Sequence, residues 1–432
     1  MASFTLEPEQ QEWCERLRVI AAERLRPLAE QGEPGRVNRP LVAALGEYGL
    51  LERVLPGAAP PRTVPAAPGG GQASTAGAGS GAVTGAARSA PAATRDAGTD
   101  PSASRPDSGV RALDLCLLRE SLARECTEAE TALALQGLGS YPLVQSGGRK
   151  LRERWLPEVV AGRAVAGFAL SEPGPGSDAA ALALAAEPEG AGRAGRADGA
   201  AGWRLTGEKC WISNAPEADF YTVFARTGEA PGARGISAFL VPADRPGLSG
   251  EHLDMLSPHP IGSLAFDGVP VSSADLLGEP GGGFRVAMRT LDLFRPSVGA
   301  FAVGMAQAAL DASLAHADTR TAFGGPLRNL QAVSHQLAEM ATRIEAARLL
   351  VHSAAAAYDD GVPGVAKRSA MAKLFATETA QYVVDAAVQL HGARALQRGH
   401  LLEHLYREVR APRIYEGATE VQRTIIAKEL YR

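Results

Sequence analysis

Hydrophobic residues recur at steps of three and four toward both ends of the chain. Such spacing places them on one face of a helix, so it predicts helices that bury that face. The clearest stripes are Trp13, Leu17, Ile20 and Ala21 near the start, and Leu330, Val333, Leu337, Met340 and Ile344 toward the end. A further stripe with Met371, Leu374, Val384 and Val388 predicts another helix of the same bundle.

The middle of the chain follows a different pattern. Short apolar runs lie between turns that contain glycine and proline, which is typical of strands. These runs are 164–170, 220–225 and 236–242. The sequence therefore predicts helices over 1–164, a strand-rich region over 165–278 and helices again over 279–432.

Composition interrupts the first helical region. Ala, Gly, Pro, Ser and Thr supply 43 of the 53 residues from 56 to 108. A segment with so few large apolar side chains cannot bury enough surface to offset the entropy of ordering it. We therefore interpret 56–108 as a disordered insert, and the Gly- and Ala-rich stretch 187–202 as a long hairpin loop.

Charge and composition argue against several functions. The 432 residues include 44 Lys and Arg and 48 Asp and Glu, so the net charge of −4 lacks the positive footprint of a nucleic-acid-binding protein. No uninterrupted apolar run reaches the roughly 18 residues of a membrane span. The start has no basic segment followed by an apolar one, as a secretory signal would. The four cysteines have no metal-ligand spacing, so we expect reduced thiols in a cytoplasmic protein without a metal site.

Two segments of the strand-rich region carry candidate chemistry. The turn after the first strand offers glycines and the hydroxyls of Ser171 and Ser177, which suit a ligand lying against the backbone. Within 207–215, Trp211 can stack on a planar cofactor and Ser213 can hydrogen-bond to its edge. Each segment also fits a plainer structure, namely an ordinary Gly/Pro turn and a tryptophan in the core.

Two further segments lie in the last helical region. Arg320, beside a glycine-rich turn and followed by Gln331, is suited to holding a phosphate. Glu416 lies on a glycine-containing turn and can point into a cleft as a base. Taken alone, both are also compatible with solvated surface residues. Thr419 and Gln422, just after this turn, fit the capping box of a final helix.

Taken together and in this order, the motifs resemble the acyl-CoA dehydrogenase family. The matching pieces are 168–178, Gly207-Glu-Lys-Cys-Trp-Ile-Ser-Asn214, Arg320-Thr-Ala-Phe-Gly324, Gln389-Leu-His-Gly392 and Ile414-Tyr-Glu-Gly417. The resemblance covers essentially the whole chain except the 56–108 insert. It implies an α+β, mainly α fold, with an amino-terminal helical domain (1–164), a middle β-barrel domain (165–278) and a carboxy-terminal four-helix bundle (279–432).

The resemblance also implies the reaction and its partners. FAD is the expected cofactor, and the expected substrate is an acyl-CoA, or an acyl group on a carrier protein. Glu416 would abstract the α-proton while N5 of the flavin takes the β-hydride, leaving a trans-2-enoyl thioester. An electron-transfer flavoprotein would accept the electrons, and the chain would form a homotetramer or a dimer.

Individual roles follow by carrying the family pattern onto this sequence. The catalytic base would be Glu416, and Tyr415 and Gly417 would contact the substrate. Cofactor contacts would come from Phe168, Leu170, Ser171, Ser177, Trp211, Ser213, Arg320, Phe323, Gln331, Gln389 and Gly392. Of these, the five from Arg320 onward would reach the FAD of a neighbouring subunit. Ser177 would also lie near the substrate, and Asp292 and Arg295 would contact its CoA portion.

Departures from the family pattern leave alternatives open. Ala393, Ala395 and Ala418 replace a glycine, a glycine and a threonine that the family commonly has, and they could alter contacts to FAD. One alternative is a carrier-protein-linked dehydrogenase or a flavin monooxygenase on the same fold, although the retained Glu416 argues against the monooxygenase. Another is a non-catalytic family member, which the retained Glu416, Trp211 and Arg320 argue against.

Overall fold

The structure is a computed structural model that describes residues 5–56, 109–189, 202–228 and 230–431. The predicted disordered insert, apart from Pro56, and most of the predicted hairpin loop lie outside these residues.

The first part of the chain is helical, as the spacing of apolar residues predicts. Its helices are α1 (Pro8–Ile20), continued by a π-helical turn over Ala21–Leu25, α2 (Arg26–Ala29), α3 (Arg39–Glu47), α4 (Leu50–Val54), α5 (Ala112–Glu125), α6 (Thr127–Ser146) and α7 (Arg149–Val160). The Asn38 side chain caps α3 by accepting from the backbone N–H of Leu41 at 3.0 Å. Leu17 and Ala21 of the predicted stripe are buried.

Seven strands form one curled sheet in the middle of the chain. They are β1 (Ala166–Ala169), β2 (Ala185–Pro188), β3 (Gly202–Ser213), β4 (Phe220–Arg226), β5 (Ile236–Pro242), β6 (Leu248–His252) and β7 (Ile261–Ser272). The order is β1-β4-β2-β3-β7-β6, with β5 pairing antiparallel to β4. All residues of β5 are buried, which explains why its sequence is a continuous apolar run rather than an alternating one.

Long helices complete the chain. They are α8 (Gly283–Thr319), α9 (Gln331–Asp359), α10 (Val365–His391), α11 (Leu401–Glu408) and α12 (Thr419–Leu430), with a small hairpin of β8 (Thr321–Ala322) and β9 (Gly325–Pro326) after α8. Leu337, Met340 and Ile344 of the predicted stripe are buried in α9. The predicted fold class, mainly helical with a sheet in the middle and a helical carboxy-terminal region, is confirmed.

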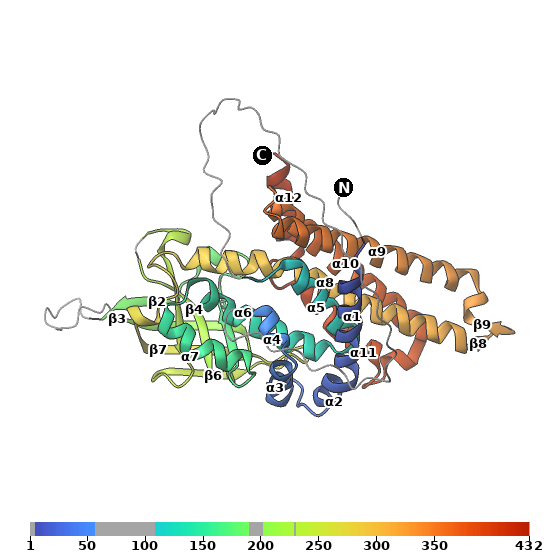
Figure 1. Ribbon diagram of the computed structural model, residues 1–432, viewed down its shortest axis with the longest axis horizontal. Helices are drawn as coiled ribbons and strands as arrows, with labels where there is room; N and C mark the ends of the chain where they lie inside the picture. Colours follow the sequence, from blue (N-terminus) through green and yellow to red (C-terminus); the bar gives the residue numbers. More distant parts are fainter. Residues whose placement is uncertain (1–4, 57–108, 190–201, 229, 432) are drawn as a thin grey trace, which may run out of the picture.

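Helix α8 connects the two halves of the molecule. Figure 1 shows it running from the sheet to the far end of the bundle, where the β8–β9 hairpin lies. It packs against α5, α6, α9 and α10, and also against β5. Its first residue, Gly283, lies so close to β5 that a Cβ there would come within 2.3 Å of the Ser237 backbone, so this approach requires glycine. In the described part of the chain, α8 has the length and apolar composition of a membrane span, but 72% of its most apolar window is buried.

Asp359, at the end of α9, fixes where the chain re-enters the fold after the insert. Its carboxylate is buried and accepts from the backbone N–H groups of Ala112 (2.7 Å) and Leu113 (3.1 Å) at the start of α5. Those amides have no partner within their own helix, so the carboxylate replaces water for them.

We expect Asp359→Ala to lower the free energy of unfolding by about 1–2 kcal/mol, because two amides at the start of α5 lose their acceptor. Asp360→Ala, at the neighbouring exposed position, is the matched control and should change stability by less than about 0.5 kcal/mol. Urea unfolding of both variants measures the difference. Equal losses in the two would show that Asp359 does not cap α5.

Candidate active site

Backbone strain marks the candidate site. Among the described residues, the non-glycine residues with positive φ are Trp211 (58°), Asn214 (64°), Phe323 (52°) and Glu416 (51°). This region is unfavourable for a residue with a side chain and tends to occur at functional positions. Three of these four residues are candidates from the sequence alone, and the fourth lies within the same motif as Trp211.

Glu416 lies on the turn between the one-turn helix Ala411–Arg413 and α12. Lys373 of α10 donates from Nζ to the carbonyl oxygens of Tyr415 (3.1 Å) and Gly417 (2.7 Å), which flank Glu416. Gln422 of α12 donates from Nε2 to the carbonyl of Gly417 as well, at 2.8 Å. A Cβ on Gly417 (φ 94°) would meet that Nε2 at 2.4 Å, so the turn needs glycine there.

The predicted capping box at α12 is wrong. The residue that caps the helix is Ala418, whose side chain makes no capping bond. The Thr419 hydroxyl instead donates to Oε1 of Glu378 at 2.9 Å. The side-chain amide of Gln422 points into the preceding turn, where its Nε2 donates to the carbonyls of Glu416 (3.4 Å) and Gly417 (2.8 Å).

The carboxyl of Glu416 is subject to two opposing effects, burial and nearby positive charge. Its Oε2 is buried and has no hydrogen-bond partner among the described residues. Burial raises the pKa of Glu416, whereas the nearby cations Arg119, Arg295 and Lys373 act to lower it. A carboxylate that is deprived of water but kept near cations is a stronger base than a solvated one and can still ionise.

Arg119 belongs to a buried polar network beside this turn. It pairs with Glu130 of α6, and its Nη1 donates to Oγ of Ser297 on α8 at 2.7 Å. Glu130 in turn lies near His259, which pairs with Glu408 of α11. Burial raises the pKa of Glu130, and Arg119 and His259 oppose that rise.

The predicted contacts from the sheet side lie on a segment that a buried lysine ties to β3. Lys209 is fully buried and donates from Nζ to the carbonyl of Leu170 (3.0 Å) and to Oε1 of Glu172 (2.8 Å). Glu172 also accepts from the backbone N–H groups of Ala183 (2.6 Å) and Leu184 (2.9 Å). Burial lowers the pKa of Lys209 to about 8, and Glu172 opposes that shift.

The other predicted residues of this segment differ in exposure. Phe168 is half-buried and packs on Phe224, with the ring centroids 5.0 Å apart. Ser171 is half-buried, and its carbonyl accepts from Cys210 of β3 at 3.0 Å. Ser177 is exposed on the turn that follows. The main chain, rather than the serine hydroxyls, therefore fixes the segment to β3.

Trp211 is not a core tryptophan. It interrupts the pairing of β3 with β7, where the register shifts between Lys209 and Ile212, and 48% of its surface is exposed. A bulge that turns a side chain out of the strand accounts for both the exposure and the positive φ. Ser213, two residues on, is half-buried at the end of β3.

Asp292 and Arg295 lie one helical turn apart on α8. Nη1 of Arg295 donates to Oδ1 of Asp292 at 3.0 Å, and the Arg295 Nε is buried without a partner among the described residues. Burial raises the pKa of Asp292, and Arg295 opposes that rise. Because Arg295 also acts on the pKa of Glu416, the structure places it close to the Glu416 turn.

The remaining predicted contacts lie at the far end of the bundle. Arg320 follows α8, and Phe323, on the β8–β9 hairpin, is 93% exposed. Gln331 is exposed at the start of α9, and Gln389 and Gly392 are exposed where α10 ends. His316 of α8 stacks on His391 of α10 at 4.2 Å, so the ends of these two helices meet. Figure 1 shows the β8–β9 hairpin at the opposite end of the bundle from the sheet.

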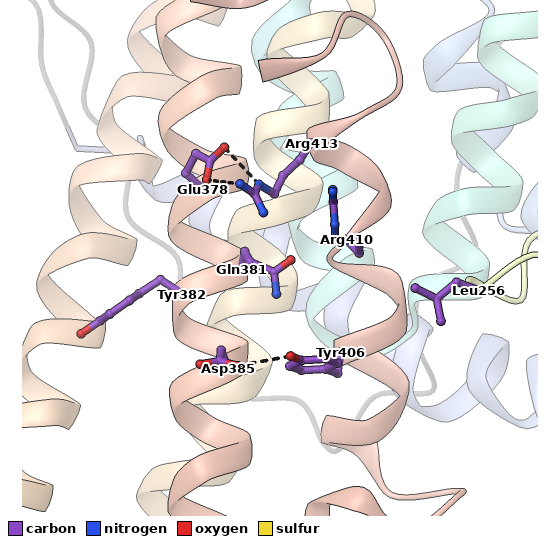
Figure 2. A pocket seen from close by; sticks show the side chains of 8 residues that line it. All are labelled: Leu256, Glu378, Gln381, Tyr382, Asp385, Tyr406, Arg410 and Arg413. Atoms are coloured by element: carbon purple, nitrogen blue, oxygen red, sulfur yellow. Dashed lines mark hydrogen bonds and ion pairs between the residues drawn. The ribbon is translucent and has the colours of Figure 1, made fainter. Parts of the chain in front are cut away.

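A pocket of about 680 Å³ opens on another face of α10 (Figure 2). None of the predicted site residues lines it. It is lined by Leu256, Glu378, Gln381, Tyr382, Asp385, Tyr406, Arg410 and Arg413. Glu378 connects it to the Glu416 turn, because its carboxylate binds both Arg413 and the Thr419 hydroxyl. We assign the site by the strained turn and its cations rather than by this pocket.

Sequence reasoning missed the buried charged residues around the candidate site. Lys209 and Glu172 lie within the quoted motifs but have no assigned role there, and Arg119 and Lys373 lie outside the motifs. A signal was present for Lys373, because it occurs on the helical face that also carries the buried Ala370, Thr377 and Ala380. A lysine on a buried helical face requires partners inside the protein.

Comparison with known proteins adds independent findings. A family model described as "Acyl-CoA dehydrogenase, middle domain" matches residues 167–269, and one described as "Acyl-CoA dehydrogenase, C-terminal domain" matches residues 281–431. The chain is 38% identical over 321 residues to cyclohexane-1-carbonyl-CoA dehydrogenase of Geobacter metallireducens, covering 74% of this chain and 81% of that protein. It is 39% identical over 328 residues to the mitochondrial short-chain specific acyl-CoA dehydrogenase of Bos taurus, covering 75% and 77%. The solved structure of butyryl-CoA dehydrogenase from Megasphaera elsdenii matches with a TM-score of 0.80 at 28% identity, over 100% of both chains.

We expect Glu172→Ala to lower the free energy of unfolding by about 3–5 kcal/mol, because Lys209 is then buried without its ion-pair partner. Glu187→Ala, at an exposed position on β2, is the control and should cost less than about 0.5 kcal/mol. Chemical denaturation measures both. A small loss for Glu172→Ala would mean that the Lys209 ammonium is stabilised by other groups.

Proposed function

The chain belongs to the acyl-CoA dehydrogenase family, and from this we propose that it is a flavin-dependent enzyme that converts an acyl-CoA to its 2-enoyl thioester. Members of the family are oxidoreductases that act on a CH–CH bond of acyl-CoA. The observation that carries the proposal is the strained Glu416 turn, with its buried carboxyl Oε2, at the position of the family's base motif.

Glu416 is the proposed base. The α-proton of a thioester is weakly acidic, so its removal requires a carboxylate with raised basicity, which burial provides. The proton passes from the α-carbon of the substrate to an oxygen of Glu416. The bound acyl chain excludes water and so keeps the carboxylate basic. Arg295, beside this turn, carries a charge suited to the CoA portion.

The exposed residues of the structure fit FAD. The indole of Trp211 stands out from β3 at a bulge, as stacking on a planar ring requires. Gly392 has φ 64° and nothing within 4 Å of where a Cβ would be, so a phosphate can approach its backbone. Phe168, Leu170 and Ser171 would hold the ring from the sheet side, with Ser177 and Ser213 beside it. When bound, FAD supplies an oxidant for the carbon–carbon bond.

The departures from the family pattern affect this fit unequally. Ala395 is fully buried, so its methyl group packs into the protein and not toward a surface ligand. Thr419 cannot replace the missing threonine at Ala418, because its hydroxyl is committed to Glu378. Ala393 is exposed beside Gly392, so its methyl group can touch a ligand that lies against the Gly392 backbone.

We further propose that the enzyme works as a homo-oligomer. The β8–β9 hairpin, which Arg320 precedes and which carries Phe323, lies at the opposite end of the bundle from β3 (Figure 1). The contact of His316 with His391 brings the end of α10, with Gln389 and Gly392, to the end of α8. These residues are therefore proposed to serve a site other than that of Trp211 in the same chain. The exposure of Phe323 supports a role for this end in a second copy. An electron-transfer flavoprotein is the proposed electron acceptor, on the strength of the family alone.

The proposed substrate is a short or cyclic acyl-CoA. This rests on the relatives, whose names specify short-chain, butyryl and cyclohexane-1-carbonyl substrates. An acyl group on a carrier protein is the alternative substrate.

The first test is anaerobic titration of the flavin-loaded protein with butyryl-CoA and cyclohexane-1-carbonyl-CoA. We expect wild type to lose its visible flavin absorbance with at least one of them. Glu416→Gln should retain flavin but turn over at least about 1,000-fold more slowly, since it keeps the shape of the base without its basicity. A Glu416→Gln variant with wild-type turnover would disprove the assignment of the base. If the flavin of the wild-type protein bleaches only with a carrier-bound acyl group, the substrate is the carrier-bound thioester and not the acyl-CoA.

The pH dependence of kcat/KM tests the environment of Glu416. Because burial raises its pKa, the carboxyl becomes protonated and inactive as the pH falls through that raised value. We therefore expect the acidic limb of the profile at a higher pH than the value of about 4.3 for an exposed glutamate. The α-proton of the free substrate does not ionise in this pH range, so the acidic limb reports on the enzyme. An acidic limb at or below about pH 4.3 would contradict a raised pKa for Glu416.

A further inference from the structure

Lys373 is a buried charge that the proposed chemistry does not use. Its side chain is fully buried on α10, where an ammonium is costly unless polar groups surround it. Its hydrogen bonds run to the backbone carbonyls of Tyr415 and Gly417 and not to a side-chain carboxylate. A buried lysine whose hydrogen bonds go to two backbone carbonyls is suited to fixing the conformation of the segment between those carbonyls.

The two bonds constrain the residue between them. In an extended chain, carbonyl groups two residues apart are separated by about 7 Å. One nitrogen that lies 3.1 Å from the Tyr415 oxygen and 2.7 Å from the Gly417 oxygen holds them closer than that. The backbone must therefore turn at Glu416, and its φ of 51° is that turn. Losing the ammonium would leave the Tyr415 carbonyl without this donor and the Gly417 carbonyl with Gln422 alone, so the bridge between the two carbonyls would be gone.

We infer that Lys373 is a positioning residue for Glu416, because its ammonium holds the turn in the left-handed conformation that orients the Glu416 side chain. This inference rests on the proposed role of Glu416 as the base. It assigns no contact between Lys373 and the substrate or the cofactor.

Electrostatics agree with this geometry. Burial lowers the pKa of Lys373 to about 8, and Glu416 is the group that most opposes this shift. The interaction is mutual, since Lys373 is among the cations that act to lower the pKa of Glu416. The charged groups that act on one or both residues are Arg119 on α5, Arg295 on α8, Glu378 on α10 and Glu420 on α12.

The first experiment uses hydrogen exchange of the turn in the flavin-loaded protein. Lys373→Met removes both donors and the charge, and Lys373→Gln keeps one amide donor without the charge. Lys428→Met, at an exposed position on α12, is the matched control. We expect amides around residues 415–418 to exchange at least about 10-fold faster in Lys373→Met, less so in Lys373→Gln, and at the wild-type rate in the control.

The second experiment measures kinetics and their pH dependence on the same variants. For Lys373→Met we expect kcat to fall by about 100-fold with a smaller change in KM, because a misplaced base affects the chemical step most. In both Lys373 variants the acidic limb of the kcat/KM profile should move to higher pH, because Glu416 loses a nearby cation. Flavin content, measured by absorbance, should remain that of wild type.

The outcomes separate this inference from the proposed function. Unchanged exchange of 415–418 in both Lys373 variants would overturn the inference even if wild type is an active dehydrogenase. Faster exchange with wild-type kcat and an unshifted acidic limb would also overturn it, because the turn would then not position the base. A wild type inactive on every acyl thioester would instead refute the proposed function. If Lys373→Met does not fold, Lys373→Gln decides both measurements.

Discussion

The structure depends on keeping one carboxylate out of water without neutralising it. Burial alone favours the protonated form of Glu416, and full pairing with a cation would lower its basicity. The protein places cations on α5, α8 and α10 near the carboxyl and leaves its Oε2 without a hydrogen-bond partner among the described residues. The left-handed turn and its buried lysine are the backbone features that make this arrangement possible.

A second buried lysine holds the predicted cofactor segment in the sheet region. Lys209 ties the segment after β1 to β3 through a backbone carbonyl and Glu172, much as Lys373 ties the Glu416 turn to α10. Helix α8 packs against both the sheet and the bundle and so joins the two regions that carry these segments. The loops that carry the candidate chemistry are therefore held by buried charges rather than by extensive secondary structure.

The order of helices and strands could be predicted from sequence, because the spacing of apolar residues within each short segment depends on local structure alone. Leu337, Met340 and Ile344 are buried as their spacing requires, and the runs at 220–225 and 236–242 are β4 and β5. The motifs likewise led to Glu416 and Trp211. Contacts across the fold could not be predicted, because Lys373 and Tyr415 are 42 residues apart. The same limit explains the wrong capping box, since spacing alone could not show that Glu378 competes for Thr419.

The central claim is that Glu416 removes the α-proton of an acyl thioester. Exchange of that hydrogen with solvent deuterium, followed by mass spectrometry of the recovered thioester, isolates this step from the oxidation. The account predicts that wild type incorporates deuterium at the α-carbon and that Glu416→Gln does not, although both bind the thioester. Incorporation by Glu416→Gln at the wild-type rate would contradict the account and place the base elsewhere.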